Sequence, residues 1–223
     1  MKRVILLALL AASSAQATDT IDAFEFDVFL DKKPIGYHNF ELSRSGDRTV
    51  LSTEAKFDIK FLFVTAFSYF HQNKEVWSGD CLVEIEAQTD SNGKLSTLAG
   101  QQSDGGFTLA SDDQSMTLDG CVQSFAYWNP SILEADKLLN AQTGEYEPVD
   151  SRFDGEETLT IGGQSIDTNR YRLTSQRGDI LLWYAADGGQ WLALDAPARG
   201  ERRIRYEARD VPDADALQAM LRW

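Results

Sequence analysis

Two histidines are the residues of this chain best suited to acid–base chemistry. His38 falls on the same strand face as Phe40 and Leu42, and His71 shares a face with Glu75. A histidine beside a carboxylate can act as a general base, so one hypothesis is a hydrolase-type enzyme that uses His38 or His71. Because no motif ties a serine or cysteine to either histidine, the competing interpretation is a histidine hydrogen-bonded inside the core or at its rim.

The better-known motifs of catalysis and cofactor binding are missing from the sequence. It contains no Gly-x-Ser-x-Gly elbow, no His-Glu-x-x-His pair, no phosphate-binding loop, no Cys-x-x-Cys and no dinucleotide fingerprint. Two histidines and two cysteines also provide no set of three or four ligands at metal-site spacing. We therefore expect no metal, no cofactor and no catalytic residue defined by a motif.

The two cysteines, Cys81 and Cys121, both fall on apolar stretches that are predicted to be strand faces. In an oxidising compartment, two inward-facing cysteines favour a disulfide. The alternative is two separate buried thiols that behave as small hydrophobic groups.

The segment from Lys60 to Phe67 is apolar on both faces of a strand. It is interpreted either as a strand covered on both sides or as a hydrophobic hairpin tip or pocket lip that contacts lipid or a ligand. Farther along, two aromatic residues precede Asn129-Pro130, where a strand is expected to give way to a helix and a pocket mouth would form. The candidate ligand-binding residues are Phe61, Phe63, Phe67, His71, Tyr127 and Trp128.

The N-terminus has the layout of a secretory signal peptide. Lys2-Arg3 is a short basic region, Val4 to Ala12 is an apolar run, and Ala15-Gln16-Ala17 is a small-x-small cleavage site. The apolar run is too short for a transmembrane helix, and no cysteine follows it to accept a lipid anchor. We predict that residues 1–17 are removed on export to the periplasm or the medium and that residues 18–223 form a single β-rich domain.

The segments that must position the candidate residues are predicted to be strands, because their apolar and polar side chains alternate with a period of two. Turn signals such as Lys32-Lys33-Pro34 and Asn92-Gly93 separate them. The alternating segments are 24–30, 36–42, 51–59, 81–87, 107–109, 116–118, 170–174 and 203–209.

Helix signals are few. Asn129-Pro130 predicts a short helix that ends near Asn140, and apolar spacing predicts a second helix from Asp213 to Leu221. The acidic stretch from Ala141 to Glu157 is expected to be a surface connection. The fold class is therefore mainly β: a single antiparallel meander of about ten strands, curled into a barrel or half-barrel, with one or two short helices.

Length and charge restrict the class of partner. The chain has 223 residues, 43% of them hydrophobic, and a net charge of −14. It is long enough for one sizeable core, and its acidity argues against binding nucleic acid or anionic lipid through bulk charge. The strands carry charges where a lipid-facing band would be uniformly apolar, so we do not expect an integral membrane protein after cleavage.

Several stretches together carry a family resemblance. The most specific is CVQSFAYWNP at 121–130; the others are 26–40, 54–77, 81–82, 138–145 and 182–194. In these stretches the chain resembles the proteobacterial domain of unknown function family 6134. The resemblance implies a secreted, single-domain β protein and brings no established activity or site residue. More distantly, the meander is similar to the periplasmic lipoprotein-carrier fold, in which a half-barrel wraps around helices and shelters acyl chains.

Three hypotheses for the function follow. The first is an exported binding or carrier module for an apolar small molecule or lipid, held in the concavity of the sheet. The second is an envelope protein with a structural or partner-binding role and no pocket. The third is the enzyme that uses His38 or His71.

Overall fold

The computed structural model describes residues 20–61, 64–112, 114–187 and 189–210. Within these ranges the chain forms one antiparallel sheet of thirteen strands, a second sheet of two short strands and one 3₁₀ helix, with no α-helix. None of the helical structure described there is long and apolar enough to cross a membrane. The predicted signal peptide 1–17 and the predicted helix from Asp213 to Leu221 lie outside the described residues.

The large sheet is a meander in which strands adjacent in the sequence pair, except that β15 pairs with β1. Its strand order is β11-β12-β13-β14-β15-β1-β2-β3-β4-β5-β6-β7-β8, so the first strand pairs with the last. The strands are β1 (Thr20–Leu30), β2 (Lys33–Ser45), β3 (Arg48–Phe61), β4 (Val64–Ser78), β5 (Cys81–Ser91), β6 (Lys94–Ser103), β7 (Gly106–Ser111), β8 (Ser115–Leu118), β11 (Asp150–Ile161), β12 (Gln164–Ser175), β13 (Gly178–Ala185), β14 (Trp191–Pro197) and β15 (Arg203–Ala208).

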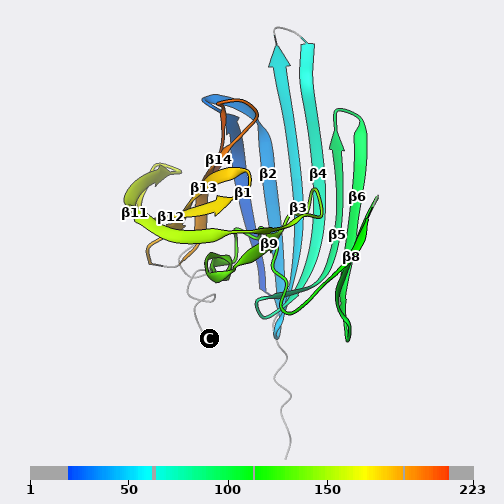
Figure 1. Cartoon of the computed structure of the whole chain (residues 1–223). Helices are drawn as coiled ribbons and strands as arrows, with labels where there is room; N and C mark the ends of the chain where they lie inside the picture. Colours follow the sequence, from blue (N-terminus) through cyan, green and yellow to red (C-terminus); the bar gives the residue numbers. More distant parts are fainter. Residues whose placement is uncertain (1–19, 62–63, 113, 188, 211–223) are drawn as a thin grey trace, which may run out of the picture.

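The sheet curls but does not close (Figure 1). Its edges are β8 and β11, which do not pair with each other in the described part of the chain. The prediction of a mainly antiparallel β fold is confirmed, and the closed-barrel alternative is wrong. After β8 the chain leaves the sheet and returns to it only at Asp150, so residues 119–149, which we call the crossing segment, run between the two edges.

The crossing segment is part of the core. It contains the 3₁₀ helix η1 (Pro130–Glu134) and the strand pair β9 (Lys137–Leu139) and β10 (Tyr146–Pro148). Val122, Ile132 and Leu138 are fully buried against side chains of the large sheet. The concave face of the sheet therefore encloses this segment.

The predicted helix up to Asn140 is wrong beyond Glu134. Asn129 caps it as expected, since its side chain accepts a hydrogen bond from the backbone N–H of Ser131 at 3.1 Å. Residues 137–139 then turn to strand because they pair with 146–148. The same pairing contradicts the expectation of a surface connection from 141 to 157, a range that contains β10 and the start of β11.

The strand count of about ten was too low. The strands β9 and β10 lie in stretches that were predicted to be a helix and a surface connection, because each is only three residues long and has too few residues to show an alternating pattern. By contrast, the Asn92-Gly93 turn between β5 and β6 is confirmed, with φ of 56° and 81°.

The β3–β4 hairpin is longer than its neighbours. Its two strands pair as far as Phe61 opposite Val64, whereas β2 pairs with β3 only up to Phe57 and β5 pairs with β4 only from Tyr69. The end of the hairpin therefore projects from the sheet (Figure 1). Of the candidate residues at this end, Phe63 lies outside the described residues, and only the backbone of Phe61, in β3, is described.

The predicted disulfide joins Cys81 and Cys121, whose Cα atoms are 5.0 Å apart. Its expected position on apolar strand faces is wrong for Cys121, which is exposed and lies outside any strand. Next to the bridge, the N–H of Leu82 donates to the carbonyl of Val122 at 2.8 Å. The bridge thus attaches the start of the crossing segment to β5.

Candidate functional site

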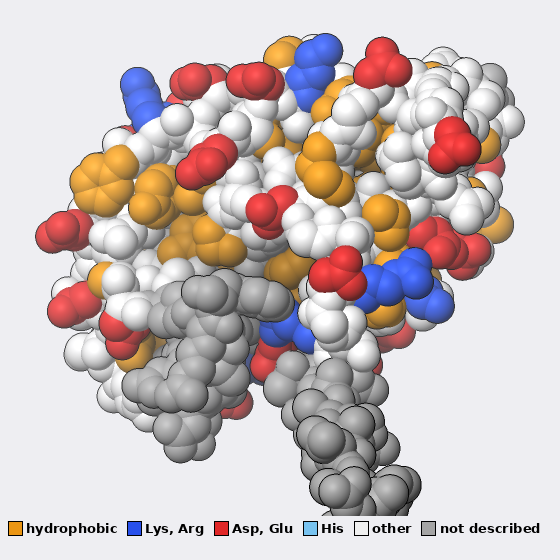
Figure 2. Space-filling model, turned by 90° about the horizontal axis from the view of Figure 1, so that it is seen from below, with side chains coloured by type: hydrophobic (Ala, Val, Ile, Leu, Met, Phe, Trp, Pro, Cys, Tyr) orange, Lys and Arg blue, Asp and Glu red, His pale blue; other side chains and the backbone are white. Residues whose placement is uncertain are grey.

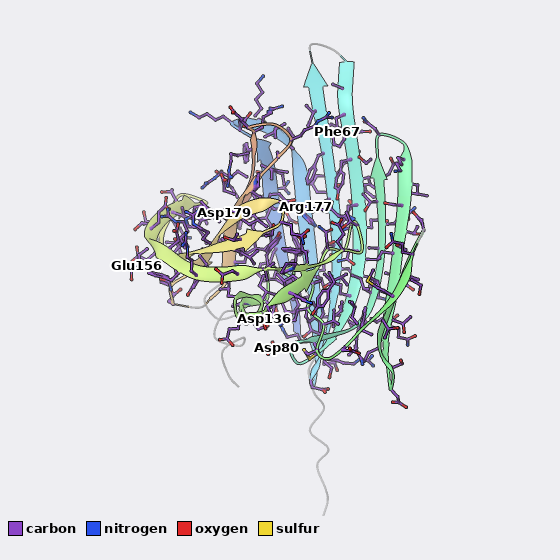
Figure 3. All side chains as sticks on the ribbon, viewed as in Figure 1. Phe67, Asp80, Asp136, Glu156, Arg177 and Asp179 are labelled. Atoms are coloured by element: carbon purple, nitrogen blue, oxygen red, sulfur yellow. A yellow bond between two sulfur atoms is a disulfide. The ribbon has the colours of Figure 1, made fainter. Side chains whose placement is uncertain are left out.

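A cavity of about 390 Å³ lies between the concave face of the sheet and the crossing segment. One wall comes from β2, β3 and β4, a second from residues 124–128 and 140–142 of the crossing segment, and a third from the region of β13–β15. Figure 3 shows Phe67 on β4, within the projecting β3–β4 hairpin, and Arg177 on the turn between β12 and β13. Both residues line the cavity. Segments distant in the sequence thus meet at one partly open cavity.

Strand register places the two histidines in one row across the concave face. His38 is opposite Ala55 on β3, and Ala55 is opposite His71 on β4. The next row, two residues farther along each strand, holds Phe40, Thr53 and Asn73. Because side chains alternate along a strand, residues two apart point the same way, and the rows stack into one continuous face.

Burial keeps both histidines uncharged. It lowers the pKa of His38 to about 3, with a smaller contribution from His71 nearby, and lowers the pKa of His71 to about 4. His38 Nδ1 lies 3.3 Å from the Tyr206 hydroxyl, and His71 Nδ1 lies 2.8 Å from the Thr89 hydroxyl. Neither imidazole has a carboxylate as a hydrogen-bond partner among the described residues.

Glu75 takes part in a different network from the one the hydrolase hypothesis requires. Its Oε1 accepts hydrogen bonds from Asn73 at 2.8 Å and from Ser124 at 2.9 Å, and its Oε2 accepts one from Trp77 Nε1 at 2.9 Å. Its side chain is buried, which raises the pKa of the carboxyl group, while the three hydrogen bonds act in the opposite direction. The expected His71–Glu75 pair is therefore not formed in this structure, and Glu75 instead holds β4 and the crossing segment together.

Aromatic side chains form part of the remaining wall, and some of them pack against aromatic rings behind it. Phe57 and Tyr69 stack with ring centroids 5.1 Å apart, and Tyr127 lies 5.4 Å from the ring of Trp191. Trp128 meets Trp77 edge-on at 5.6 Å. These rings give the wall an apolar surface, and each of them packs against another ring.

Four of the six candidate ligand-binding residues line this cavity together: Phe67, His71, Tyr127 and Trp128. Their contact with a ligand remains a prediction. The expectation that a strand precedes Asn129 is wrong, since Tyr127 and Trp128 lie in a turn of the crossing segment. The Tyr184 hydroxyl fixes this turn by donating to the carbonyl of Tyr127 at 2.9 Å.

Glu147 and Tyr206 also line the cavity but were not among the predicted site residues. Glu147 is 3% exposed; its Oε2 accepts a hydrogen bond from the N–H of Gln176 at 3.3 Å, and its Oε1 has no partner in the part of the chain that the structure describes. Glu147 was assigned to the acidic surface stretch 141–157. In such a stretch the sequence does not distinguish an inward-facing carboxyl group from its exposed neighbours. Tyr206 belongs to a strand that was recognised, but only the pairing of β15 with β1 brings it beside His38.

No group of three or more His, Cys, Asp and Glu residues suitable for a metal ion is found in the described ranges. The expectations of no metal and no cofactor therefore remain predictions for the whole chain.

Comparison with known proteins supports the fold. The family model for the domain of unknown function DUF6134 matches residues 26–209, and the chain belongs to this family. The chain is also similar to the crystal structure of a beta-barrel-like protein of domain of unknown function DUF1849 from Brucella abortus. The TM-score is 0.63 at 10% sequence identity, covering 86% of this chain and 97% of that one. At this identity the likeness shows a shared fold only. No curated protein matches the chain.

Proposed function

We propose that this protein is an exported binding or carrier module that holds an apolar, lipid-like ligand in the cavity between its sheet and its crossing segment. The observation that carries the proposal is the cavity itself. Its volume of about 390 Å³ falls in the range of small-molecule sites, which span about 300–1,000 Å³. Aromatic rings from β3, β4 and the crossing segment surround it.

The energetics favour an apolar occupant. Each CH₂ group moved from water into such a site contributes about 0.8 kcal/mol, and an acyl chain or ring system supplies several. The wall is held by the Glu75 network and the disulfide, so little of this free energy is spent on ordering the protein.

Export is supported by two features. The N-terminal sequence has the layout of a signal peptide, and disulfides such as Cys81–Cys121 persist in oxidising compartments. Both agree with a carrier that works in the periplasm or outside the cell.

A second candidate function is partner binding in the envelope. The β3–β4 hairpin projects past β2 and β5, and a projecting hairpin offers free backbone groups to another chain. This alternative needs no ligand in the cavity. The hydrolase hypothesis receives less support, because the Nδ1 atom of each histidine lies within hydrogen-bond distance of a hydroxyl group, and the hydrogen bonds of Glu75 come from Asn73, Trp77 and Ser124 instead.

Native mass spectrometry of protein purified from the periplasm tests the proposal. A carrier is expected to retain a co-purified ligand that dissociates on collisional activation. A chain that is always ligand-free, and that binds no added apolar probe, would favour the partner-binding alternative.

A further inference from the structure

We propose that the cavity selects an uncharged ligand that carries a hydroxyl group on its apolar body, and that it discriminates against carboxylates such as free fatty acids. This inference rests on the proposed function and names the ligand class of the same site. It follows from the charges that line the cavity and from the polar atoms there that have no partner.

The charges of the lining residues disfavour an anion. The acidic groups are Glu75 and Glu147, both almost fully buried. The basic groups are the two histidines and Arg177. The histidines are uncharged at neutral pH, because burial lowers their pKa values to about 3 and about 4.

Arg177 is already paired. Its guanidinium donates to Glu145 Oε2 at 2.5 Å and lies 3.4 Å from the Thr143 hydroxyl. A ligand carboxylate therefore meets no unpaired positive charge in the described wall and lies near buried carboxyl groups. Since burying an unpaired charge is costly, the ligand that enters fully is neutral.

The surrounding protein adds to this discrimination. The chain carries a net charge of −14. Figure 2 shows acidic side chains spread over the end of the molecule opposite the projecting hairpin. A field of this sign lowers the local concentration of anions and leaves neutral molecules unaffected.

Unpaired polar atoms of the lining residues indicate the hydroxyl group. Asn73 Oδ1 and Glu147 Oε1 are buried and have no hydrogen-bond partner among the described residues, and the same holds for Trp128 Nε1 and His38 Nε2. The first two accept, the indole N–H donates, and the imidazole nitrogen does either according to its tautomer. A hydroxyl group both donates and accepts, so it suits any of the four.

These atoms lie beneath the cavity surface, so a hydroxyl group reaches one of them when that side chain turns toward the ligand. A buried polar atom without a partner is unfavourable, and the hydrogen bond gained offsets the cost of turning the side chain. Bound water is the competing partner, and the experiment must separate the two.

The experiment is the displacement of a neutral dye, N-phenyl-1-naphthylamine, from the mature oxidised protein at pH 7.5. The competitors are 1-decanol, decanoate and decyl methyl ether, which share the chain but differ in charge and hydrogen bonding. We expect 1-decanol to bind at least about tenfold more tightly than either of the others, which corresponds to about 1.4 kcal/mol.

Each result decides a separate step. Decanoate that binds as tightly as 1-decanol would overturn the selection for neutral ligands and leave the carrier function standing. Decyl methyl ether that binds as tightly as 1-decanol would overturn the selection for a hydroxyl group. It would indicate that bound water satisfies the unpaired polar atoms of the wall. Protein that binds neither dye nor competitor would overturn the proposed function itself.

Variants test the charge argument directly. Glu147→Gln removes a carboxyl group from the wall and is expected to raise the affinity for decanoate several-fold. Glu86→Gln, on the exposed face of β5, changes the net charge by the same amount and is expected to leave the affinity for decanoate unchanged. Glu145→Gln is a second variant in case Glu147→Gln fails to fold. The side chain of Glu145 is exposed, so its replacement preserves the core, and it removes the carboxylate that pairs with Arg177. It too is expected to raise the decanoate affinity, and no increase would contradict the inference.

Discussion

Ser124 donates a hydrogen bond of 2.9 Å to the buried carboxyl group of Glu75, across 49 residues of sequence. This contact joins the crossing segment to the concave face of the sheet, beside the cavity. Glu75 also accepts from Asn73 and Trp77, so one acceptor satisfies three buried donors.

Replacing Glu75 with alanine is expected to lower the free energy of unfolding by about 3 kcal/mol or more. The substitution leaves three buried donors without their acceptor, and each such loss costs about 1–3 kcal/mol. Urea unfolding followed by tryptophan fluorescence measures the change. Glu86→Ala, on the exposed face of the adjacent strand, is the control and should have little effect. Equal stability of the two variants would show that the network contributes nothing.

Acid should destabilise the protein through His38 and His71, whose imidazole rings are shielded from water. Their folded-state pKa values, about 3 and about 4, lie below the ordinary value of 6.5, so below pH 6.5 the unfolded chain binds protons that the folded chain does not. Stability is therefore fully present above pH 6.5 and is lost as pH falls toward 4. Between pH 7 and pH 5 the expected loss is about 2 kcal/mol for each histidine.

The measurement is urea unfolding at pH 7 and pH 5 for the natural chain and for His71→Leu. The variant should lose about 2 kcal/mol less between the two pH values, whatever its stability at pH 7. A raised pKa at Glu75 acts in the opposite direction in both proteins, so it cancels in the comparison. An identical pH dependence of the two chains would contradict the assignment of His71 as buried and neutral.

Breaking the Cys81–Cys121 bridge should destabilise the fold by about 3–4 kcal/mol, the value expected for a loop of 40 residues. The double variant Cys81→Ser/Cys121→Ser, compared with the oxidised natural chain in urea, gives the difference. Intact mass after alkylation in denaturant establishes the starting state. Two alkylated thiols in unreduced periplasmic protein would mean that the bridge does not form in the cell.

Cleavage of the leader should leave a mature chain that begins at Thr18. The basic start, the apolar run and the small residues at positions 15 and 17 predict this site. N-terminal sequencing of the protein from a periplasmic fraction tests it. Protein that begins at Met1 and remains in the cytoplasm would remove the basis for an exported carrier.

Local patterns predicted much of the fold. Alternation and turn residues located strands such as β1 and β3, and Asn92-Gly93 located a hairpin, because these signals depend on neighbours in the sequence. The pairing of β1 with β15 and the strand pair β9–β10 were not predicted. They depend on contacts between distant segments, for which a single sequence carries no local signal.

The site was predicted in part for the same reason. Aromatic residues such as Tyr127 stand out in the sequence, and the structure places them at the cavity. Glu147 did not stand out, because an inward carboxyl group reads like its exposed acidic neighbours. The partner of Glu75 was assigned wrongly to His71: two side chains on one strand face are close, but the donors that reach Glu75 include Ser124, which arrives on the crossing segment.

The most direct test of the central claim is a titration of the mature protein with N-phenyl-1-naphthylamine, comparing Ala196→Trp with Ala110→Trp. Ala196 lines the cavity, and an indole there fills much of it, whereas Ala110 is exposed on β7. We predict saturable binding of one dye per chain to the natural protein and to Ala110→Trp, and at least about tenfold weaker binding to Ala196→Trp. Equal binding by all three proteins, or binding by none, would contradict the claim that the cavity holds an apolar ligand.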